Sequence, residues 1–478
     1  MSPDRNETPP DWRSLQDGID GEVVLADSTA YDAVNQPFNL RFEGVRPRGI
    51  VRCATPQDVA EAMSFVVRHG LPSATRSGGH CFGGRSSSTG VVVDVTLMDS
   101  VTVSDGGATV GAGARLGPVY DALQERGRAI PGGTCPSVGI AGLTLGGGLG
   151  ILGRSYGVTS DQLVGADVVL ADGRIVRCDE HHHDDLFWAL RGAGAGSFGV
   201  VTSFDFRTVP APEATNIHAT WPPSQAAAAI EAWQAWSPTG PDGLAASLKV
   251  TTTGDLDQPP SVDLYAAVVG GELDAAELLD DLVVRVGSDP TSARHSRMSF
   301  PETRRFWADL GAEQGASRGG PLEATQRVHL HTKSEFFRRP LSGDAIAGLV
   351  EALAAERVAG ESRELDFMPW GGAYNRVPPD ATAFVHRDEL FQLKHSAVID
   401  PPATAAAAAA AQRWVSRSWA AVHPWGSGRV FQNFADPDLE DWAEAYYGTN
   451  YDRLRRVKAR YDPSGVFRVR QSIDAGHG

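Results

Sequence analysis

A chain of 478 residues, 42% hydrophobic and 21% charged, is long enough for two or three domains with a large buried core. Its formal net charge of −16 argues against a nucleic-acid partner and against binding to anionic membranes. No apolar run approaches the ~18–20 residues of a membrane span. The polar start of the chain lacks the apolar core of a secretory signal, so we expect a cytoplasmic protein.

The first part of the chain predicts alternating strands and helices with many glycines, after a polar lead-in with the first helical turns over residues 1–42. Thr55, Pro56 and Asp58 mark a helix start, since threonine can cap it and proline suits its first position. The expected strands are 49–53, 91–95, 108–112, 167–170, 174–177 and 200–204, and the expected helices after the first are 116–126 and 185–191. Ala171-Asp172-Gly173 predicts a hairpin between two of these strands.

The sequence changes character near residue 214 and again near residue 425. Between these points, apolar strands such as 247–250 and 262–265 alternate with alanine-rich helices. The alanine run within 403–414 predicts a helix, because alanine is the best helix former. A closing helix is expected after residue 425.

Two glycine-rich segments each carry one nucleophilic side chain. The first is Arg76-Ser77-Gly78-Gly79-His80, and the second runs from Gly132 to Gly139 and contains Cys135. Glycine lets the backbone approach a ligand closely and adopt positive φ. Two such loops of matching character indicate a cofactor held from two sides.

Other motifs support fewer conclusions. The stretch 194–199 fits a dinucleotide-binding GxGxxG, but it follows an expected helix and precedes an expected strand, which is the wrong context for a Rossmann site. The run 146–150 favours backbone amides facing an anion. The run 181–185 contains three histidines, which we interpret as a solvated loop, so no metal is expected. The four cysteines form no CxxC pair, and no disulfide is expected.

The two loops and several further segments resemble one enzyme family. The combination is similar to the berberine bridge enzyme branch of the vanillyl-alcohol oxidase flavoprotein superfamily, which has a PCMH-type FAD-binding domain. The segments that carry the likeness, besides the two loops, are 156–163, 186–192, 198–202, 446–454, 461–467 with Lys458, and 471–473.

The resemblance implies an α+β fold and a covalent flavin. An FAD-binding domain formed by residues 1–213 and by the C-terminal segment 425–478 would enclose a central α/β substrate-binding domain, 214–424, with an antiparallel sheet. His80 would attach to the 8-methyl carbon of FAD and Cys135 to ring carbon 6. The implied cofactor-binding residues are Arg76, Ser77, Gly78, Gly79, His80, Cys135, Val138, Gly139, Gly142, Gly146, Gly147, Gly199, Val201 and Asn450.

Three positions bear on oxygen. Gly133, two residues before Cys135, resembles the family's oxidases, which leave space for O2 beside the flavin. Thr144 and Leu149 are similar to the apolar oxygen pocket of flavin-N5-oxide oxygenases. Those oxygenases typically keep only the histidine link, and the presence of Cys135 departs from their pattern.

The chain lacks phenols that its sugar- and alcohol-oxidising relatives use. Phe82 and Leu149 stand where such relatives usually or often have tyrosine. Phe431 and Phe434 replace both tyrosines of a C-terminal Tyr-x-Asn-Tyr strand, one of which acts as base in those relatives. The pocket is therefore expected to be more apolar than a usual sugar site.

The strand 390–396 supplies the candidate catalytic residues. Alternation places Gln392, Lys394 and Ser396 on one face. Lys394 falls where berberine bridge enzyme carries its glutamate base; it could be a base if burial lowers its pKa, bind an acidic or enolic substrate, or be a surface lysine. Tyr374 is a second candidate, with a core aromatic as the alternative.

The expected function is an FAD-dependent oxidase of bacterial secondary metabolism. It would move a hydride from an alcohol, glycosyl or polyketide-like substrate to flavin N5 and then reduce O2 to H2O2. The alternatives are a flavin-N5-oxide-type oxygenase, an oxidative cyclase, and a flavin-binding protein that has lost its base. The expected partners are a small-molecule substrate and O2, and the chain would be a monomer or homodimer.

Overall fold

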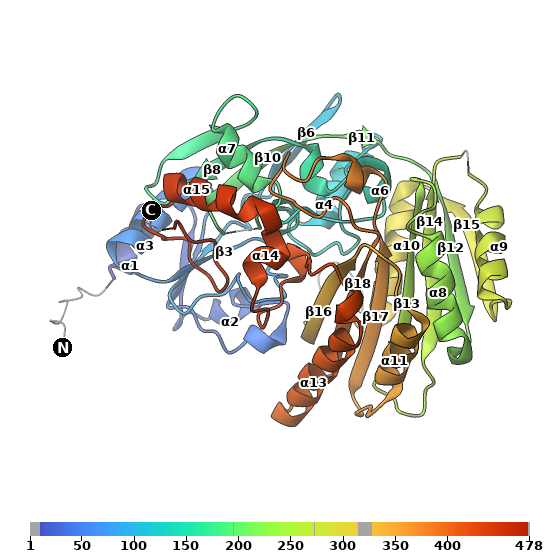
Figure 1. Ribbon diagram of the computed structural model, residues 1–478. Helices are drawn as coiled ribbons and strands as arrows, with labels where there is room; N and C mark the ends of the chain where they lie inside the picture. Colours follow the sequence, from blue (N-terminus) through green and yellow to red (C-terminus); the bar gives the residue numbers. More distant parts are fainter. Residues whose placement is uncertain (1–9, 195, 272, 314–326, 477–478) are drawn as a thin grey trace.

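The computed structural model describes residues 10–194, 196–271, 273–313 and 327–476. Two large hydrophobic cores organise these residues. In Figure 1 the N-terminal segment and the C-terminal helices α14 (Trp442–Tyr447) and α15 (Tyr451–Tyr461) lie on one side, and the central segment lies on the other. This mixed fold with antiparallel sheets agrees with the expected fold class.

The N-terminal part contains two principal sheets. The first has the order β1 (Glu22–Leu25), β2 (Gly49–Arg52), β4 (Val91–Asp94) and β3 (Ser73–Arg76), with parallel pairing of β2 and β3 to β4. The second is antiparallel, in the order β5 (Val101–Ser104), β6 (Gly107–Gly111), β10 (Val200–Arg207), β8 (Leu163–Val169) and β9 (Ile175–Cys178). All four residues of β4 are buried, as expected for a parallel strand covered on both faces.

Helices and loops on these sheets confirm most local predictions. Helix α3 (Pro56–Arg68) begins at a capping box between Thr55 and Asp58. The predicted hairpin is present as β8 and β9. The remaining helices are α1 (Trp12–Asp17), α2 (Tyr31–Val34), α4 (Leu116–Gln124), α5 (Ile140–Leu145), α6 (Gly153–Tyr156) and α7 (Asp184–Leu190). Strand β1 lies in the stretch expected to be a polar lead-in.

The central segment forms a seven-stranded antiparallel sheet. Its order is β15 (Ser292–Met298), β12 (Ala214–Trp221), β14 (Ser261–Val269), β13 (Leu244–Thr252), β17 (Glu361–Pro369), β18 (Phe391–Ile399) and β16 (His329–Phe337). Helices α8 (Ala226–Trp236), α9 (Ala275–Val286), α11 (Gly343–Ala354) and α13 (Ala405–Val422) contribute to the apolar core of this segment. Figure 1 shows α8, α11 and α13 over one face of the sheet.

Strand alternation explains how this sheet can carry charges inside the molecule. Leu365 and Phe367 of β17 belong to the apolar core shared with the helices. Glu364 and Asp366 point to the opposite face, where the sheet meets the N-terminal part. The sheet therefore has one apolar face and one polar, buried face.

The C-terminal segment packs into the N-terminal core, to which Tyr446, Leu454 and Tyr461 belong. Lys458, in the C-terminal signature, is buried and donates to the carbonyls of Ser197 and Phe467 and to the Asp462 carboxylate at 2.6–2.7 Å. The stretch with Phe431 and Phe434 contains a 3-10 turn, Gln432–Phe434. We keep residues 213 and 424 as proposed domain limits.

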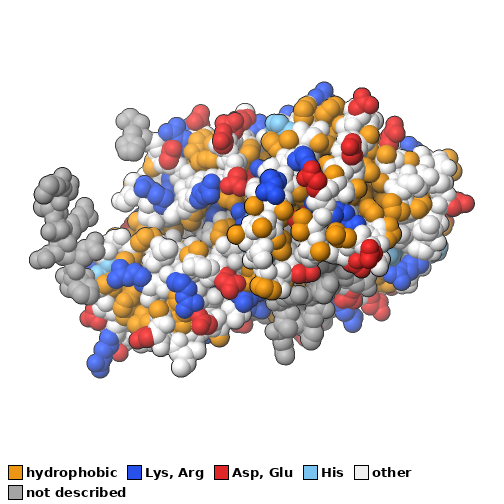
Figure 2. Space-filling view, turned by 90° about the horizontal axis from the view of Figure 1, so that it is seen from below, with side chains coloured by type: hydrophobic (Ala, Val, Ile, Leu, Met, Phe, Trp, Pro, Cys, Tyr) orange, Lys and Arg blue, Asp and Glu red, His pale blue; other side chains and the backbone are white. Residues whose placement is uncertain are grey.

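Within the described residues, no helix is long and apolar enough to cross a membrane. Figure 2 shows basic and acidic side chains intermingled over the face that it presents, which offers no broad patch of a single sign.

Candidate active site

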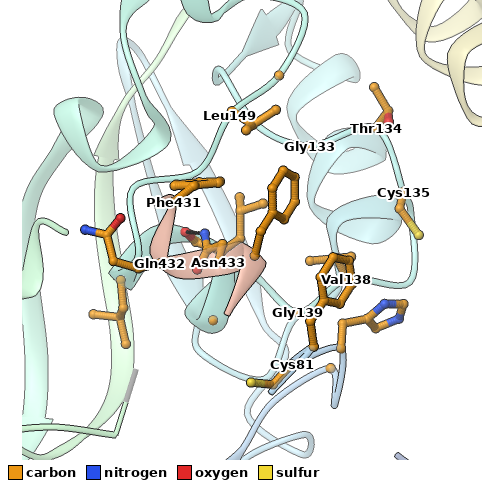
Figure 3. A pocket seen from close by; sticks show the side chains of 18 of the residues that line it. Cys81, Gly133, Thr134, Cys135, Val138, Gly139, Leu149, Phe431, Gln432 and Asn433 are labelled. Carbon is orange, nitrogen blue, oxygen red and sulfur yellow. Dashed lines mark hydrogen bonds between the residues drawn. The ribbon is translucent and has the colours of Figure 1, made fainter. Parts of the chain in front are cut away.

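One large pocket lies between the N-terminal loops and the polar face of the central sheet. Figure 3 shows Cys135 and Val138 on one side of it, with Phe431 and Gln432 on the other. Its walls include the three glycine-rich loops around residues 78, 139 and 196, and strands β13, β17 and β18. The pocket therefore joins the two parts of the fold.

The two loops with nucleophilic side chains cross in direct contact. A Cβ on Gly78 would lie 2.2 Å from the backbone N of Gly139, so neither position has room for a side chain. Gly79 has φ +71°, a conformation that favours glycine. Ser77 fixes the first loop by donating to the Ala112 carbonyl at 2.8 Å. These contacts explain the glycines on both loops.

This crossing brings His80 and Cys135 to the same hydroxyl group. Oγ of Ser137 lies 3.1 Å from Nε2 of His80 and 3.3 Å from Sγ of Cys135. The imidazole also stacks on Phe38, with ring centroids 4.2 Å apart. Burial, with a smaller effect of Arg115, lowers the pKa of His80 to about 4. A neutral imidazole and a thiolate are both nucleophiles, and here His80 and Cys135 border one pocket.

Most of the predicted site residues line the pocket. They are Arg76, Ser77, Gly78, Gly79, His80, Gly133, Cys135, Val138, Gly139, Gly142, Leu149, Gly199, Val201, Tyr374 and Lys394. Gly194 and Gly196 also line it, so the loop that resembled a dinucleotide motif does border the cavity. Arg76 is buried and donates to the Ser86 and Val34 carbonyls, which brace the loop.

Five predicted residues do not line the pocket, and they are Gly146, Gly147, Thr144, Gln392 and Asn450. Side chains at Gly146 and Gly147 would meet Asn433 and Phe384, so close packing rather than a bound anion explains these glycines. Asn450 donates to carbonyls of Pro379 and Thr382, and thus holds that loop in place. Gln392 is fully buried and its amide has no hydrogen-bond partner in the described structure.

The polar face of the sheet carries a buried charge tetrad: Lys249, Glu364, Asp366 and Lys394. Asp366 lies between the two lysines in the strand register. Nζ of Lys394 is 3.2 Å from both Asp366 Oδ2 and Glu364 Oε1, and Nζ of Lys249 is 3.2 Å from Glu364 Oε2. Only Lys394 of this tetrad was predicted. Alternation along 361–369 was the available signal for the two carboxylates.

The tetrad corrects the idea that Lys394 is a base. Burial would lower the pKa of Lys394, but the carboxylates of Glu364 and Asp366 outweigh burial and raise it above its usual value. Burial likewise opposes the charge on Glu364, yet Lys249 and Lys394 bring the pKa of Glu364 down to about 2. The two carboxylates keep Lys394 charged, so Lys394 is an ammonium donor.

Tyr374 lines the pocket, but its contacts are those of a structural residue. Its ring stacks on Trp370 with centroids 4.1 Å apart, and its hydroxyl donates to the Gly150 carbonyl at 3.3 Å. Burial raises the pKa of Tyr374. A buried phenol that is already hydrogen-bonded is a poor base, so its contact with Gly150 favours a structural role next to Leu149.

Phenylalanine rings form the wall where relatives have phenols. Phe82 stacks on Phe434 at 5.6 Å, and Phe431 meets Phe434 edge-on at 5.2 Å. Nζ of Lys394 lies 5.3 Å from the centre of the Phe434 ring. The substrate side of the pocket therefore combines an aromatic wall with the charge tetrad.

The oxygen-related residues divide between pocket and core. A Cβ on Gly133 would lie 3.2 Å from Cδ1 of Leu143, so any side chain there would crowd this wall. Figure 3 shows Leu149 on the same side of the pocket as Phe431 and above it in this view. Thr144 is fully buried outside the lining, and its hydroxyl has no partner within the described residues. Thr144 therefore does not form the pocket surface.

The residues present fit a flat, anionic dinucleotide cofactor. Four glycines of three loops, at 78, 139, 194 and 196, border the cavity, and side chains at 78 and 139 would close the crossing of the first two loops. Two nucleophiles border the same space. Together with the mixed fold, this arrangement defines a flavin-dependent oxidoreductase.

Comparisons with known proteins agree. A family model described as FAD binding domain matches residues 47–179, and one described as berberine and berberine like matches 430–474. The FAD-linked oxidoreductase YgaK of Bacillus subtilis is 31% identical over 95% of this chain and 97% of its own length. Aclacinomycin-N/aclacinomycin-A oxidase of Streptomyces galilaeus is 30% identical, over 95% of this chain and 89% of its own.

A solved structure supports the same assignment. Glucooligosaccharide oxidase from Acremonium strictum, in a structure titled for its 6-S-cysteinyl, 8α-N1-histidyl FAD, has a TM-score of 0.86 at 26% identity and covers 98% of this chain and all of that one. The chain belongs to the berberine bridge enzyme-like FAD-linked oxidoreductases. The recognised family, the FAD cofactor and the enzyme class are thus confirmed.

Proposed function

We propose that this protein is an oxidase with FAD bound through both His80 and Cys135, which oxidises a hydroxylated, partly aromatic or glycosylated secondary metabolite and reduces O2 to H2O2. The observation that carries the proposal is the pair of distances from Ser137 Oγ, 3.1 Å to His80 Nε2 and 3.3 Å to Cys135 Sγ. One flat cofactor can reach both nucleophiles only if they border one space, and here they do.

The chain's own residues hold and orient the cofactor. The loops with Gly78, Gly139 and Gly196 offer backbone without side chains, which suits a pyrophosphate or a ring edge. His80 and Cys135 would tie the ring from two directions. When bound, FAD supplies the redox step by accepting a hydride from the substrate and passing two electrons to oxygen.

Asp366 is the proposed general base. Its Oδ2 accepts a hydrogen bond from Lys394, while its Oδ1 is buried and has no hydrogen-bond partner in the described structure. Glu364 Oε1 also makes no hydrogen bond within the described residues, but each oxygen of Glu364 lies 3.2 Å from a lysine, Oε1 from Lys394 and Oε2 from Lys249, so Glu364 is less suited. Asp366 lines the pocket, and a carboxylate oxygen without a hydrogen-bond partner can take the proton of a substrate hydroxyl.

Lys394 would position this base and not replace it. Its ammonium lies 3.2 Å from Oδ2 of Asp366 and fixes the carboxylate orientation. It also offers further N–H donors to a substrate oxygen that becomes more negative. This role keeps Lys394 in the catalytic site while changing the chemistry that the sequence suggested.

The walls of the pocket support a proposal for the class of substrate. Phe82 and Phe434 offer a stacked aromatic surface, and the tetrad on β13, β17 and β18 offers charged hydrogen-bonding groups. A substrate with a ring for the first and hydroxyls for the second matches both. The names of two relatives, an aclacinomycin oxidase and a glucooligosaccharide oxidase, are consistent with such substrates.

Oxygen uptake in the presence of substrate tests the reaction. Purified protein should consume one O2 and release one H2O2 for each substrate molecule oxidised. With ¹⁸O2, the label should appear in peroxide and not in the organic product. Label in the product would instead support the oxygenase alternative, and flavin that substrate cannot reduce would contradict both.

A further inference from the structure

Ser137 has a single hydroxyl proton but two nucleophilic neighbours. Oγ contacts Nε2 of His80 at 3.1 Å and Sγ of Cys135 at 3.3 Å. Ser137 itself is buried, at 7% exposure. Within the described residues, no hydrogen bond is formed by Nδ1 of His80, and Sγ of Cys135 bonds to no other group than Ser137.

The protons on these three groups must be arranged in concert. If the hydroxyl donates to Sγ, then Oγ accepts from Nε2–H, the ring proton of a neutral imidazole is on Nε2, and Nδ1 has a free lone pair. If the hydroxyl donates to Nε2 instead, the proton of neutral His80 is on Nδ1, and the thiol can donate to Oγ. The first arrangement exposes both nucleophiles, and the second masks both.

We propose that Ser137 is a positioning residue for cofactor attachment, which couples the two links by orienting His80 to react through Nδ1 while donating to the sulfur of Cys135. The inference rests on the proposed two-link flavin and adds a positioning residue to it; an N1-histidyl link is already named for the Acremonium strictum structure. Phe38, stacked on the imidazole at 4.2 Å, limits rotation of the ring. Burial keeps the imidazole neutral, and neutral histidine is the nucleophilic form.

Each link is an oxidative substitution that oxygen can complete. Nδ1 forms a C–N bond to the methyl carbon, which loses one hydrogen, and Nε2–H gives up its proton through the Ser137 hydroxyl. Sγ forms a C–S bond to a ring carbon, which also loses one hydrogen. Each bond leaves two electrons in the cofactor, and O2, the acceptor of the proposed function, removes them with two protons as H2O2.

The kinetics of attachment in newly made full-length protein test this role. Synthesis is stopped after a short pulse, and peptides with His80 and with Cys135 are followed by mass spectrometry. Ser137→Ala should lengthen the half-time of the Cys135 link by roughly tenfold or more, since a hydrogen bond to a charged group is lost. Ser137→Thr, which keeps the hydroxyl, should restore it to within about twofold of the wild type.

Wild-type half-times for both links in Ser137→Ala would overturn the inference. A delay that Ser137→Thr does not rescue would also overturn it, because it would indicate a packing role. Ser155→Ala, which removes a hydroxyl bonded to the Asp242 carbonyl and to neither nucleophile, serves as the matched control.

A second measurement needs no variant. The flavin peptide of the wild-type protein is isolated, and NMR identifies the substituted ring nitrogen of His80. Substitution at Nδ1 is expected, and substitution at Nε2, the atom beside Ser137, would contradict the inference. A wild-type protein with no covalent flavin at all would instead refute the proposed function, so the two failures are distinct.

Discussion

The carboxylate of Asp366 and the ammonium of Lys394 lie 3.2 Å apart on adjacent strands and face the same pocket. This pairing supports Asp366 as the proposed base, because Lys394 is held protonated while Oδ1 of Asp366 makes no hydrogen bond within the described residues.

Removing the proposed base should abolish most turnover and leave the flavin in place. Asp366→Asn keeps the shape of the side chain but removes its basicity, so kcat/KM should fall by about 10²–10⁴-fold. Stopped-flow reduction of the flavin by substrate measures this step. Asp280→Asn, on the exposed side of α9, should behave like the wild type. An Asp366→Asn variant within threefold of wild type would exclude Asp366 as base.

The stability of the protein should depend on the balance of charges within the tetrad. Lys394→Met leaves two buried carboxylates with one lysine, and unpaired buried charge costs about 3–5 kcal/mol of unfolding free energy. The double variant Lys394→Met with Glu364→Gln restores neutrality and should recover a large part of that loss. Denaturant unfolding of the wild type, of Lys394→Met, of Glu364→Gln and of the double variant gives the coupling. Additive losses would show that the two groups do not interact.

A side chain at Gly133, two residues before Cys135, should slow the reaction of the reduced flavin with O2 and leave reduction by substrate nearly unchanged. A side chain at Gly133 meets Leu143 at once, so Gly133→Val should lower the rate of flavin reoxidation by roughly tenfold, the equivalent of about 1.4 kcal/mol in a barrier. Anaerobic reduction by substrate should change far less. Gly348→Ala, a helical glycine with open space around its Cβ, is the control. Equal slowing of both half-reactions would contradict an oxygen-specific role.

Restoring a phenol should shift substrate preference. Phe434→Tyr adds a hydroxyl to the aromatic wall, and one hydrogen bond of about 0.5–1.5 kcal/mol should raise kcat/KM for polyhydroxylated sugars relative to apolar alcohols by up to about tenfold. Phe434→Leu removes the ring without adding a hydroxyl and should give no such gain. Identical preferences in the wild type and the tyrosine variant would show that the missing phenols do not set specificity.

Stability should fall between about pH 4.5 and pH 7 because of Glu389. Burial raises its pKa from 4.5 to about 7, although Arg338 opposes this at 3.2 Å. The folded protein thus holds the proton more tightly than the unfolded chain. Its contribution to stability is complete below pH 4.5 and is lost as pH rises through 7.

Glu389→Gln should remove this dependence and raise the unfolding free energy at pH 8 by about 1–3 kcal/mol. Thermal unfolding at pH 5 and pH 8 compares the two proteins. Glu351→Gln, at an exposed carboxylate of α11, should leave the slope unchanged. If Glu389→Gln kept the pH dependence of stability seen in the wild type, another group would be responsible for it.

The sequence predicted what is encoded locally. The capping box at Thr55 and Asp58 and the glycine loops around His80 and Cys135 depend on neighbouring residues, and the structure places them as expected. The role of Lys394 could not be read in the same way. Its partners Glu364 and Asp366 lie on another strand, and the pairing appears only with the strand register.

Asn450 and Gly146 show a second limit. Both were predicted to contact the cofactor, because an amide side chain and a loop glycine are residue types that often do so. The structure gives each a protein neighbour instead, the Thr382 carbonyl and the Asn433 side chain. Close packing and cofactor binding favour the same residue types, so only the fold separates them.

Mass spectrometry of denatured, protease-digested protein tests the central claim most directly. A single FAD that joins the peptide with His80 to the peptide with Cys135 is the expected result, and His80→Ala and Cys135→Ala should each leave one link. Unmodified His80 and Cys135 peptides, with all flavin released on denaturation, would contradict the account.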